Sequence, residues 1–206
     1  MIKFLAAAIW MLFSCLASAQ NIGAKFVFGT YHPTGNSQAR FMPNKTDERA
    51  TFVFNWGTII SYQKYLYKKR LSIKFAQGAY SDCARLFAGH THIGLRINFL
   101  NGRRHSLELG VGPTYVYRQS WYRFAGYEQE VGYLKPKGDW QTAFVWYGGE
   151  IDYNYHLNDK WNISLNVIPG PPYFMTFGIG ARYWFNALAA NKDEYWRHHP
   201  KIHILH

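Results

Sequence analysis

The chain has 206 residues, a formal net charge of +11 and two cysteines, and 48% of its residues are hydrophobic, with 19% aromatic. This length suits one domain, and no Pro/Ser-rich linker or low-complexity tract divides it. After residue 20 no run of about eighteen apolar residues occurs, so the sequence predicts no transmembrane helix. The cations are scattered through the chain, and we therefore expect no nucleic-acid partner.

The N-terminal residues 1–19 have the pattern of a secretory signal peptide. Lys3 supplies the positive charge, residues 4–13 the apolar segment, and residues 17–19 a small-residue cleavage site. The segment is too short to serve as a spanning helix. We therefore expect an exported protein.

Two kinds of processing fit this signal. Ordinary cleavage leaves Gln20 as the first residue, whereas lipoprotein processing would act at Cys15, whose preceding residues fit that pattern less well. After ordinary cleavage Cys83 is the single remaining thiol. The mature chain would then hold together by packing and hydrogen bonds, without a disulfide framework.

Segments of alternating apolar and polar residues follow one another along the chain, without a helical period of comparable strength. They span residues 23–31, 51–67, 71–80, 89–100, 105–121, 140–157, 161–168 and 173–185. Most are longer than the roughly five or six residues usual in soluble sheets, and they reach the 9–11 or so that a tilted strand needs to cross a bilayer. The pattern predicts eight strands long enough to span a membrane.

The connections between these segments alternate between short turns and long loops. Outer-membrane barrels have tight periplasmic turns at one rim and larger external loops at the other. We therefore place residues 68–70, 101–104 and 158–160 on the periplasmic side. Residues 31–49 and 122–139 are the predicted external loops.

One side of each segment is apolar, and the other collects charged residues and glycines. In a membrane barrel the apolar side faces lipid and the charges fill a narrow lumen, where glycine leaves room for long side chains. Gly148 and Gly149 indicate a bulge that changes the register of their strand. The predicted lumenal charge network consists of Lys74, Arg96, Glu108, Arg118, Glu150, Asp152 and Arg182.

Aromatic residues gather near the predicted strand ends. Tyr and Trp are enriched at membrane interfaces, where their rings lie at the level of the lipid headgroups. We expect such girdles to include Tyr65, Tyr67, Tyr117, Trp121, Trp140, Trp161, Tyr173 and Trp184.

Four features of the chain carry a resemblance to a known family: the signal peptide, the alternating segments, the Asn101-Gly102 turn and the closing 178-GIGARYWF-185. In these features the chain resembles small outer-membrane proteins of the OmpA/OmpX-like barrel type. The stretch 105-HSLELGVGPTYVYR-118 is similar to barrels of Bacteroidota-type bacteria. The resemblance covers residues 20–185 and implies a closed, antiparallel, eight-stranded, up-and-down transmembrane β-barrel with a filled lumen, inserted by the barrel-assembly machinery. Members of this family usually end on the last strand, whereas residues 186–206 follow here, and we expect them to form a periplasmic tail.

Some barrels of this size modify lipid A. Outer-membrane deacylases carry His-x-Ser-Asn, in which the histidine activates the serine, and no histidine of this chain is followed by that pattern. His105 and Ser106 are adjacent, but neighbours on a strand point to opposite faces. The sequence therefore assigns no catalytic residue.

Two further clusters have both a chemical and a structural interpretation. Asp82 and Cys83 with His90 and His92 could bind zinc or pair a thiolate with an imidazole, yet their spacing matches no zinc signature. Hydrogen-bonding residues near a rim are the simpler interpretation. The lumenal carboxylates Glu108, Glu150 and Asp152 could act as acid and base, but ion pairs with the lumenal arginines are the simpler explanation.

The sequence thus predicts a non-enzymatic integral outer-membrane barrel with a structural or surface-interaction role through its external loops. Its expected partners are outer-membrane lipid, lipopolysaccharide and the assembly machinery, with no cofactor and no metal. Two alternatives remain: a deacylase-like enzyme acting on lipid A, and a soluble periplasmic carrier of lipocalin type with its apolar faces turned inward.

Overall fold

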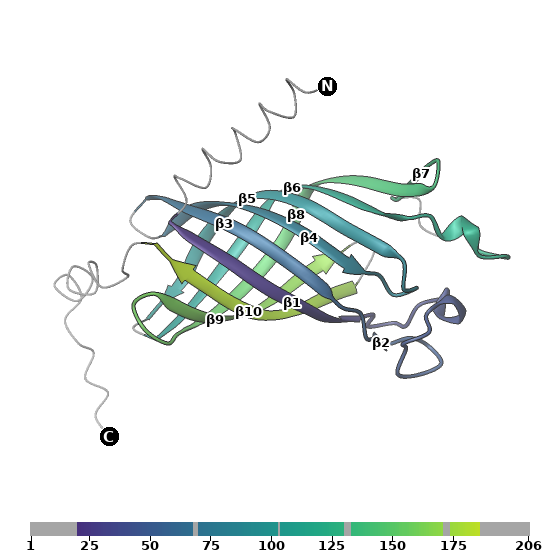
Figure 1. The fold of residues 1–206 in the computed structure, drawn as a ribbon, viewed down its shortest axis with the longest axis horizontal. Coiled ribbons are helices and arrows are strands. Elements are labelled where there is room, and N and C mark those ends of the chain that lie inside the picture. Colours follow the sequence, from purple (N-terminus) through teal and green to yellow (C-terminus); the bar gives the residue numbers. More distant parts are fainter. Residues whose placement is uncertain (1–19, 68–69, 103, 130–132, 171–173, 186–206) are drawn as a thin grey trace.

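A computed structural model describes residues 20–67, 70–102, 104–129, 133–170 and 174–185. The predicted signal peptide, Cys15 and the predicted tail lie outside these residues. Eight long antiparallel strands form a barrel (Figure 1). They are β1 (Asn21–Tyr31), β3 (Gly57–Tyr67), β4 (Leu71–Ser81), β5 (Phe87–Asn101), β6 (His105–Gln119), β8 (Trp140–His156), β9 (Trp161–Gly170) and β10 (Phe174–Trp184).

The barrel is closed by its first and last strands. Each long strand pairs with the next one along the chain, and β10 pairs with β1 from Asn21↔Trp184 to Tyr31↔Met175. Closure leaves neither strand with a free edge, which protects the backbone groups from pairing with another chain. The predicted all-β, eight-stranded, up-and-down fold is confirmed.

Two short strands extend the sheet at the loop end. β2 (Phe52–Val53) pairs with the end of β1, and β7 (Lys135–Lys137) pairs with the start of β8. The predicted strand over residues 51–67 is therefore two strands. The alternating pattern continues through residues 54–56, but these residues are not part of a strand. Here the Asn55 side chain donates a hydrogen bond to Thr30 Oγ1 at 3.1 Å.

The predicted strand over residues 105–121 also ends early. Ser120 caps the short 3₁₀ helix η2 (Trp121–Arg123) by accepting a hydrogen bond from the Tyr122 backbone N–H. A second such helix, η1 (Ala39–Phe41), lies in the first long loop.

β8 contains a bulge directly before the two glycines that predicted it. Its pairing with β6 moves from Gly112↔Gly148 to Thr114↔Val145, so two residues of β8 oppose one of β6. These two residues, Trp146 and Tyr147, both point outward and are 73% and 77% exposed. Because of this extra residue, the inner face of β8 changes from odd-numbered to even-numbered positions, and Glu150 and Asp152 point into the lumen.

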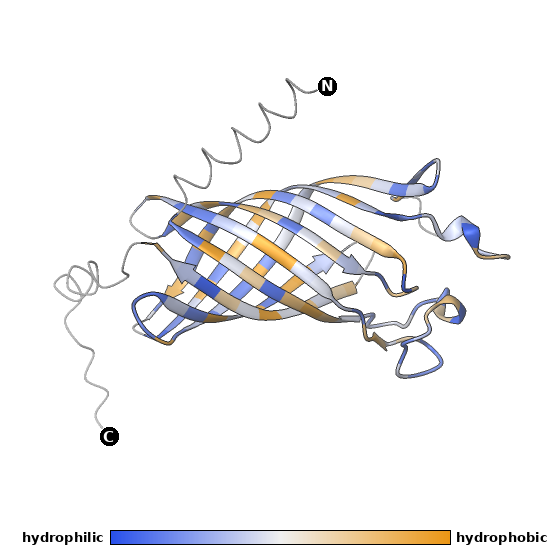
Figure 2. Ribbon diagram, viewed as in Figure 1, coloured by the Kyte–Doolittle hydropathy of each residue, from blue (hydrophilic) through white to orange (hydrophobic). Residues whose placement is uncertain are grey.

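The barrel wall has its apolar side outward and its polar side inward. Along β5 the outward residues Ile93, Leu95 and Ile97 are 47%, 52% and 58% exposed, whereas His92 and Arg96 between them are buried. Hydrophobic and hydrophilic positions alternate in the same way along the other strands (Figure 2). A soluble protein buries its apolar face, so this wall is built to contact lipid. The lipocalin-type alternative required the opposite orientation and is wrong.

The aromatic girdle is smaller than the sequence suggests. Tyr67, Trp140 and Trp161 are exposed on the outer wall near strand ends. Trp184 instead shares the inner face with Arg182 and stacks on Tyr65 inside the barrel, with ring centroids 5.7 Å apart. Trp121 is also buried, in η2, and Tyr173 lies outside the described residues.

The long loops at one end of the barrel have a small hydrophobic core of their own. It joins three loops, those between β1 and β2, between β4 and β5, and between β6 and β7. Its buried members are Ala39, Met42, Ala50, Val53, Ala84, Trp121 and Tyr127. The loop end is therefore a packed cap and not a set of separate hairpin tips. Across the described ranges, no helix is long and apolar enough to cross a membrane.

Candidate functional site

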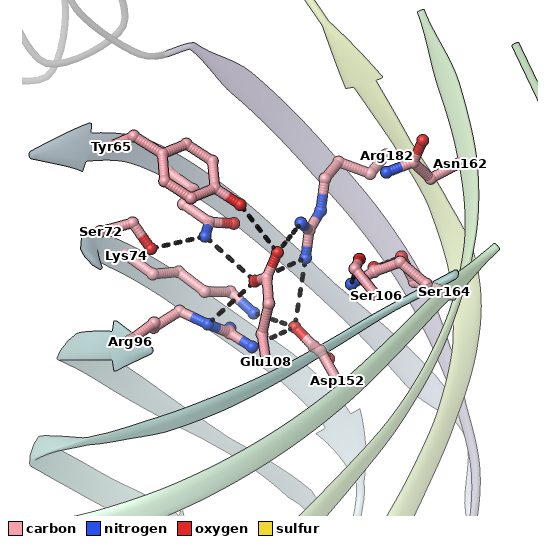
Figure 3. Close-up of polar contacts among 12 residues, drawn as sticks. Tyr65, Ser72, Lys74, Arg96, Ser106, Glu108, Asp152, Asn162, Ser164 and Arg182 are labelled. Atoms are coloured by element: carbon pink, nitrogen blue, oxygen red, sulfur yellow. Dashed lines mark hydrogen bonds and ion pairs between the residues drawn. The ribbon is translucent and has the colours of Figure 1, made fainter. Parts of the chain in front are cut away.

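The lumen contains a cluster of buried ionised side chains, which we call the charge network (Figure 3). Each member is at most 5% exposed and lies within a few residues of the turn-side end of its strand. The network joins four cations, Lys25, Lys74, Arg96 and Arg182, to three carboxylates, Glu108, Glu150 and Asp152. Strand alternation places all of them on the inner face.

Asp152 is the carboxylate with the most cationic partners. Its Oδ2 lies 2.7 Å from Arg96 Nη2, 3.1 Å from Lys74 Nζ and 3.4 Å from Arg182 Nη2. Its Oδ1 accepts a hydrogen bond from Lys25. Because β1, β4, β5 and β10 each supply one cation, Asp152 links four strands to β8.

Glu150 and Glu108 complete the network on either side. Glu150 pairs with Lys74 at 2.6 Å, with Arg96 at 2.8 Å and with Lys25 at 3.3 Å. Glu108 pairs with Arg182 at 2.7 Å and with Arg96 at 3.3 Å. It also accepts hydrogen bonds from Tyr65 Oη and Gln63 Nε2, each at 3.0 Å.

This arrangement favours a filled lumen over acid–base chemistry. A buried charge is costly unless it is paired and hydrogen-bonded, and each carboxylate here contacts at least two cations. A general acid or base needs a proton-bearing position open to a substrate. The oxygens of these carboxylates are instead directed at lysine and arginine side chains of the barrel itself.

The structure brings together six of the seven residues predicted for this network and leaves out Arg118. Glu108 and Arg118 share the inner face of β6, but ten residues of strand separate them by about 34 Å. Arg118 lies one residue from the loop-side end of β6, where Gln141 Oε1 and Tyr127 Oη accept its hydrogen bonds. Alternation predicts which face of the barrel wall a residue occupies, but it does not predict how far along the strand the residue lies from the charge network.

Lys25 belongs to the network, although it was absent from the prediction. It is buried, with bonds to Glu150 and Asp152. The signal was present in the sequence, since Lys25 alternates with the apolar Ala24 and Phe26. A comparison of faces in the first strand would have found it.

The described part of the chain does not bring Asp82, Cys83, His90 and His92 together as a metal site. Asp82 accepts hydrogen bonds from Trp121 Nε1 at 2.6 Å and from the backbone N–H groups of Ala84 and Leu86, so it holds its own loop together. His92 pairs with Thr114 Oγ1 at 2.7 Å. Among the described residues, no group of three or more His, Cys, Asp or Glu side chains has a geometry that could hold a metal ion.

His105 and Ser106 point to opposite faces of β6. His105 is exposed and its Nδ1 lies 2.6 Å from Tyr153 Oη, whereas Ser106 is buried and accepts a hydrogen bond from Asn154. The imidazole therefore does not contact the hydroxyl, as the alternation predicted.

Above the charge network the lumen widens into a cavity of about 830 Å³ that reaches the external loops. Barrel strands and the loops at this end line it, and the lining includes Tyr80, Arg118, Tyr127 and Phe174. A second cavity of about 80 Å³ lies next to it and extends to His92 and Glu150. Cavities of several hundred Å³ are the size at which small ligands bind.

No protein-family model and no curated protein matches this sequence. The fold is similar to that of the N-terminal β-barrel domain of Pseudomonas aeruginosa OprF, with 11% identity and a TM-score of 0.43 over 80% of this chain and 97% of that one. It is also similar to Ail, the attachment invasion locus protein of Yersinia pestis, with 10% identity and a TM-score of 0.44 over 81% and 99%. Ail in complex with the heparin analogue sucrose octasulfate gives 9% identity and a TM-score of 0.42 over 80% and 98%.

The architecture is that of a small eight-stranded outer-membrane barrel. This assignment rests on the closed strand pairing and the outward apolar face. Similarities as distant as these carry no information on activity or ligand.

The loop cap shields Asp82 and Cys83 from water. Burial raises the pKa of the Asp82 carboxyl above its usual range, although hydrogen bonds from Trp121 and Leu86 oppose this shift. Burial also raises the pKa of the Cys83 thiol to about 12, and the neighbouring Asp82 adds to the effect. A thiol of this kind is a poor nucleophile at neutral pH, so the environment of Cys83 is structural.

Proposed function

We propose that this chain is a non-enzymatic integral outer-membrane barrel whose external loop cap performs its function, as an interaction surface of the cell. The observation that carries the proposal is the combination of a lipid-facing wall, a lumen filled by charges at one end, and a packed cap of loops at the other. Loops held by a rigid scaffold are where binding usually resides.

The outer wall supports the location. Residues such as Leu95, Ile97 and Val111 are 52–58% exposed in the middle of long strands, and a soluble protein rarely leaves a continuous band of this kind open to water. The charge network supports a function at the loop cap and not in the lumen, because a narrow lumen filled by ion pairs does not conduct. What remains for function is the loop end.

The loop core supports an interaction role. Trp121 is 3% exposed and Met42 is 2% exposed although both belong to loops outside the barrel wall. Arg40 donates a hydrogen bond to the Gly126 carbonyl oxygen, and its guanidinium stacks on Phe41 at 4.7 Å. Contacts between distant loops give the cap a defined surface, which recognition requires.

Labelling of single cysteines in intact cells tests the orientation. In a C83S background we expect Lys137→Cys, in β7, to react with a membrane-impermeant maleimide. Lys160→Cys, in the β8–β9 turn, should react only after the outer membrane is permeabilised. Reaction of Lys160→Cys alone, or recovery of the protein in the soluble periplasm, would contradict the proposal.

The deacylase-like alternative has its own test. Mass spectrometry of lipid A from a deletion strain should show the same acylation pattern as the parent strain. A changed pattern that the intact gene restores would make the barrel an enzyme.

A further inference from the structure

The loop-side cavity combines features of a site for an anion with those of a site for an apolar group. Four cationic and two acidic side chains line the larger cavity. The acids are Glu48, in the first loop, and Asp82, whose oxygens are already bonded to Trp121, Ala84 and Leu86. The charge available to a ligand is therefore positive.

Arg118 is the cation placed deepest in this cavity. It is half-buried, its guanidinium stacks on Trp121 at 4.2 Å, and its Nε and Nη2 donate hydrogen bonds to Gln141 and Tyr127 at 3.0 and 3.1 Å. These neutral partners hold the plane of the guanidinium in place. Throughout the described part of the chain, no carboxylate lies within ion-pair distance of Arg118, unlike the arginines of the charge network. A guanidinium held in this way by neutral hydrogen-bond partners is suited to a carboxylate ligand.

Two buried residues of the cavity wall each carry a polar atom that has no hydrogen bond within the described part of the chain. His32 and Asn55 are each 5% exposed, and His32 Nδ1 and Asn55 Oδ1 have no hydrogen bond within the described residues. An unsatisfied buried polar atom costs free energy, and native proteins rarely retain one without a purpose. Both residues line the cavity, where a bound molecule with its hydration water would satisfy them.

The floor of the cavity is apolar. The larger and the smaller cavities share Tyr80, Val116, Tyr133, Phe174 and Thr176, so they meet at this level. Below it, Ile59, Ala76 and Ile168 line the smaller cavity, and the first two are buried against Val27 in a small hydrophobic cluster. Val116 and Arg118 lie two residues apart on the inner face of β6, which separates them by about 7 Å.

We infer that this cavity binds a small amphipathic carboxylate, with the carboxylate at Arg118 and the apolar part on the floor formed by Val116 and Ile168. The inference rests on the proposed function in that the cavity opens toward the external loops. The spacing of about 7 Å suits an aromatic or branched apolar group joined to a carboxylate by a few methylenes. A purely hydrophilic sugar acid would leave the floor uncovered.

Binding of 4-phenylbutyrate to the full chain in phosphatidylcholine nanodiscs tests this inference. Isothermal titration calorimetry, with empty nanodiscs subtracted, should show saturable binding. The neutral 4-phenylbutanol and the ringless butyrate should each bind at least about tenfold more weakly, because each lacks one of the two contacts. Equal binding of the acid and the alcohol, or no binding of 4-phenylbutyrate, would overturn it. Binding of glucuronate in its place would overturn the apolar half.

Variants assign the binding to the two ends of the cavity. R118Q should weaken 4-phenylbutyrate binding by about tenfold or more, and R118K should retain part of the affinity. V116F, which fills the shared floor, should weaken binding of 4-phenylbutyrate more than that of butyrate. R123Q is the matched control, since Arg123 is exposed on η2 and does not line the cavity.

Each variant must first show the mobility of a folded barrel in unheated gel samples. Unchanged affinity in folded R118Q would refute the inference. Because binding is measured on purified protein and orientation is measured in cells, the inference and the proposed function can fail separately.

Discussion

Removal of the Asp152 charge should be among the most damaging conservative changes in this barrel. Asp152→Asn keeps the shape of the side chain but leaves four buried cations to share two carboxylates. Breaking a buried ion pair by removing one partner costs about 3–5 kcal/mol. Asp152 contacts four cations at once, so we expect a loss of about 5 kcal/mol in the free energy of unfolding.

The measurement is a reversible urea titration of the barrel folded into lipid vesicles, read by tryptophan fluorescence. Asp139→Asn, which changes an exposed carboxyl at the loop end, is the matched control and should change stability by less than about 0.5 kcal/mol. In the double variant D152N/K74M one cation leaves with the carboxylate, and about 1–3 kcal/mol should return. A loss below about 1 kcal/mol for D152N would refute the view that the network holds the barrel together.

Three further predictions address the wall, the closure and the loop cap. Leu95→Arg places a charge on the outer face and should cost about 2–4 kcal/mol in vesicles, whereas a soluble protein would tolerate it within about 0.5 kcal/mol. Gly180→Val should cost about 3 kcal/mol or prevent closure, measured by gel mobility, because a Cβ at Gly180 would lie 2.0 Å from the Ala24 carbonyl oxygen across the β1–β10 seam. Cys83 reacts as its thiolate, and a pKa raised from 9.0 to about 12 lowers the thiolate fraction at pH 8. With Cys15 replaced by serine, iodoacetamide should therefore label the folded chain about a thousandfold more slowly than the unfolded chain, with the rate still rising at pH 11. Equal labelling rates at pH 8 would show that the thiol is not shielded.

The fold was predictable because alternation and loop length are local signals. The alternation within each long strand shows which of its faces is apolar, and the short turns make neighbouring strands antiparallel pairs. The bulge beside Gly148 was also readable, since paired glycines weaken a strand. What alternation does not report is where a strand ends, because aromatic residues such as Phe54 and Trp56 continue the pattern beyond the point at which pairing stops.

The site was predictable in part for the same reason. Face assignment identified the lumenal charges, but contact also depends on height along the barrel, which the register of several strands sets together. Arg118 lies on the inner face of β6, as predicted, but at the loop-side end of the barrel, too far along the strand to contact the charge network. The loop core and the cavity beneath it depend on contacts between segments as distant as Arg40 and Gly126, and no local pattern encodes them.

The position of the charge network determines what the cavity can do. The network crosses the lumen toward the turn-side rim, where it joins four basic side chains to three carboxylates. A ligand in the cavity above would therefore enter and leave by the same mouth, between the external loops. Passage through the barrel would require several buried ion pairs to separate at once. The structural plug and the binding site are in this way parts of one arrangement, in which ion pairs close one half of the barrel and leave the other half free to bind.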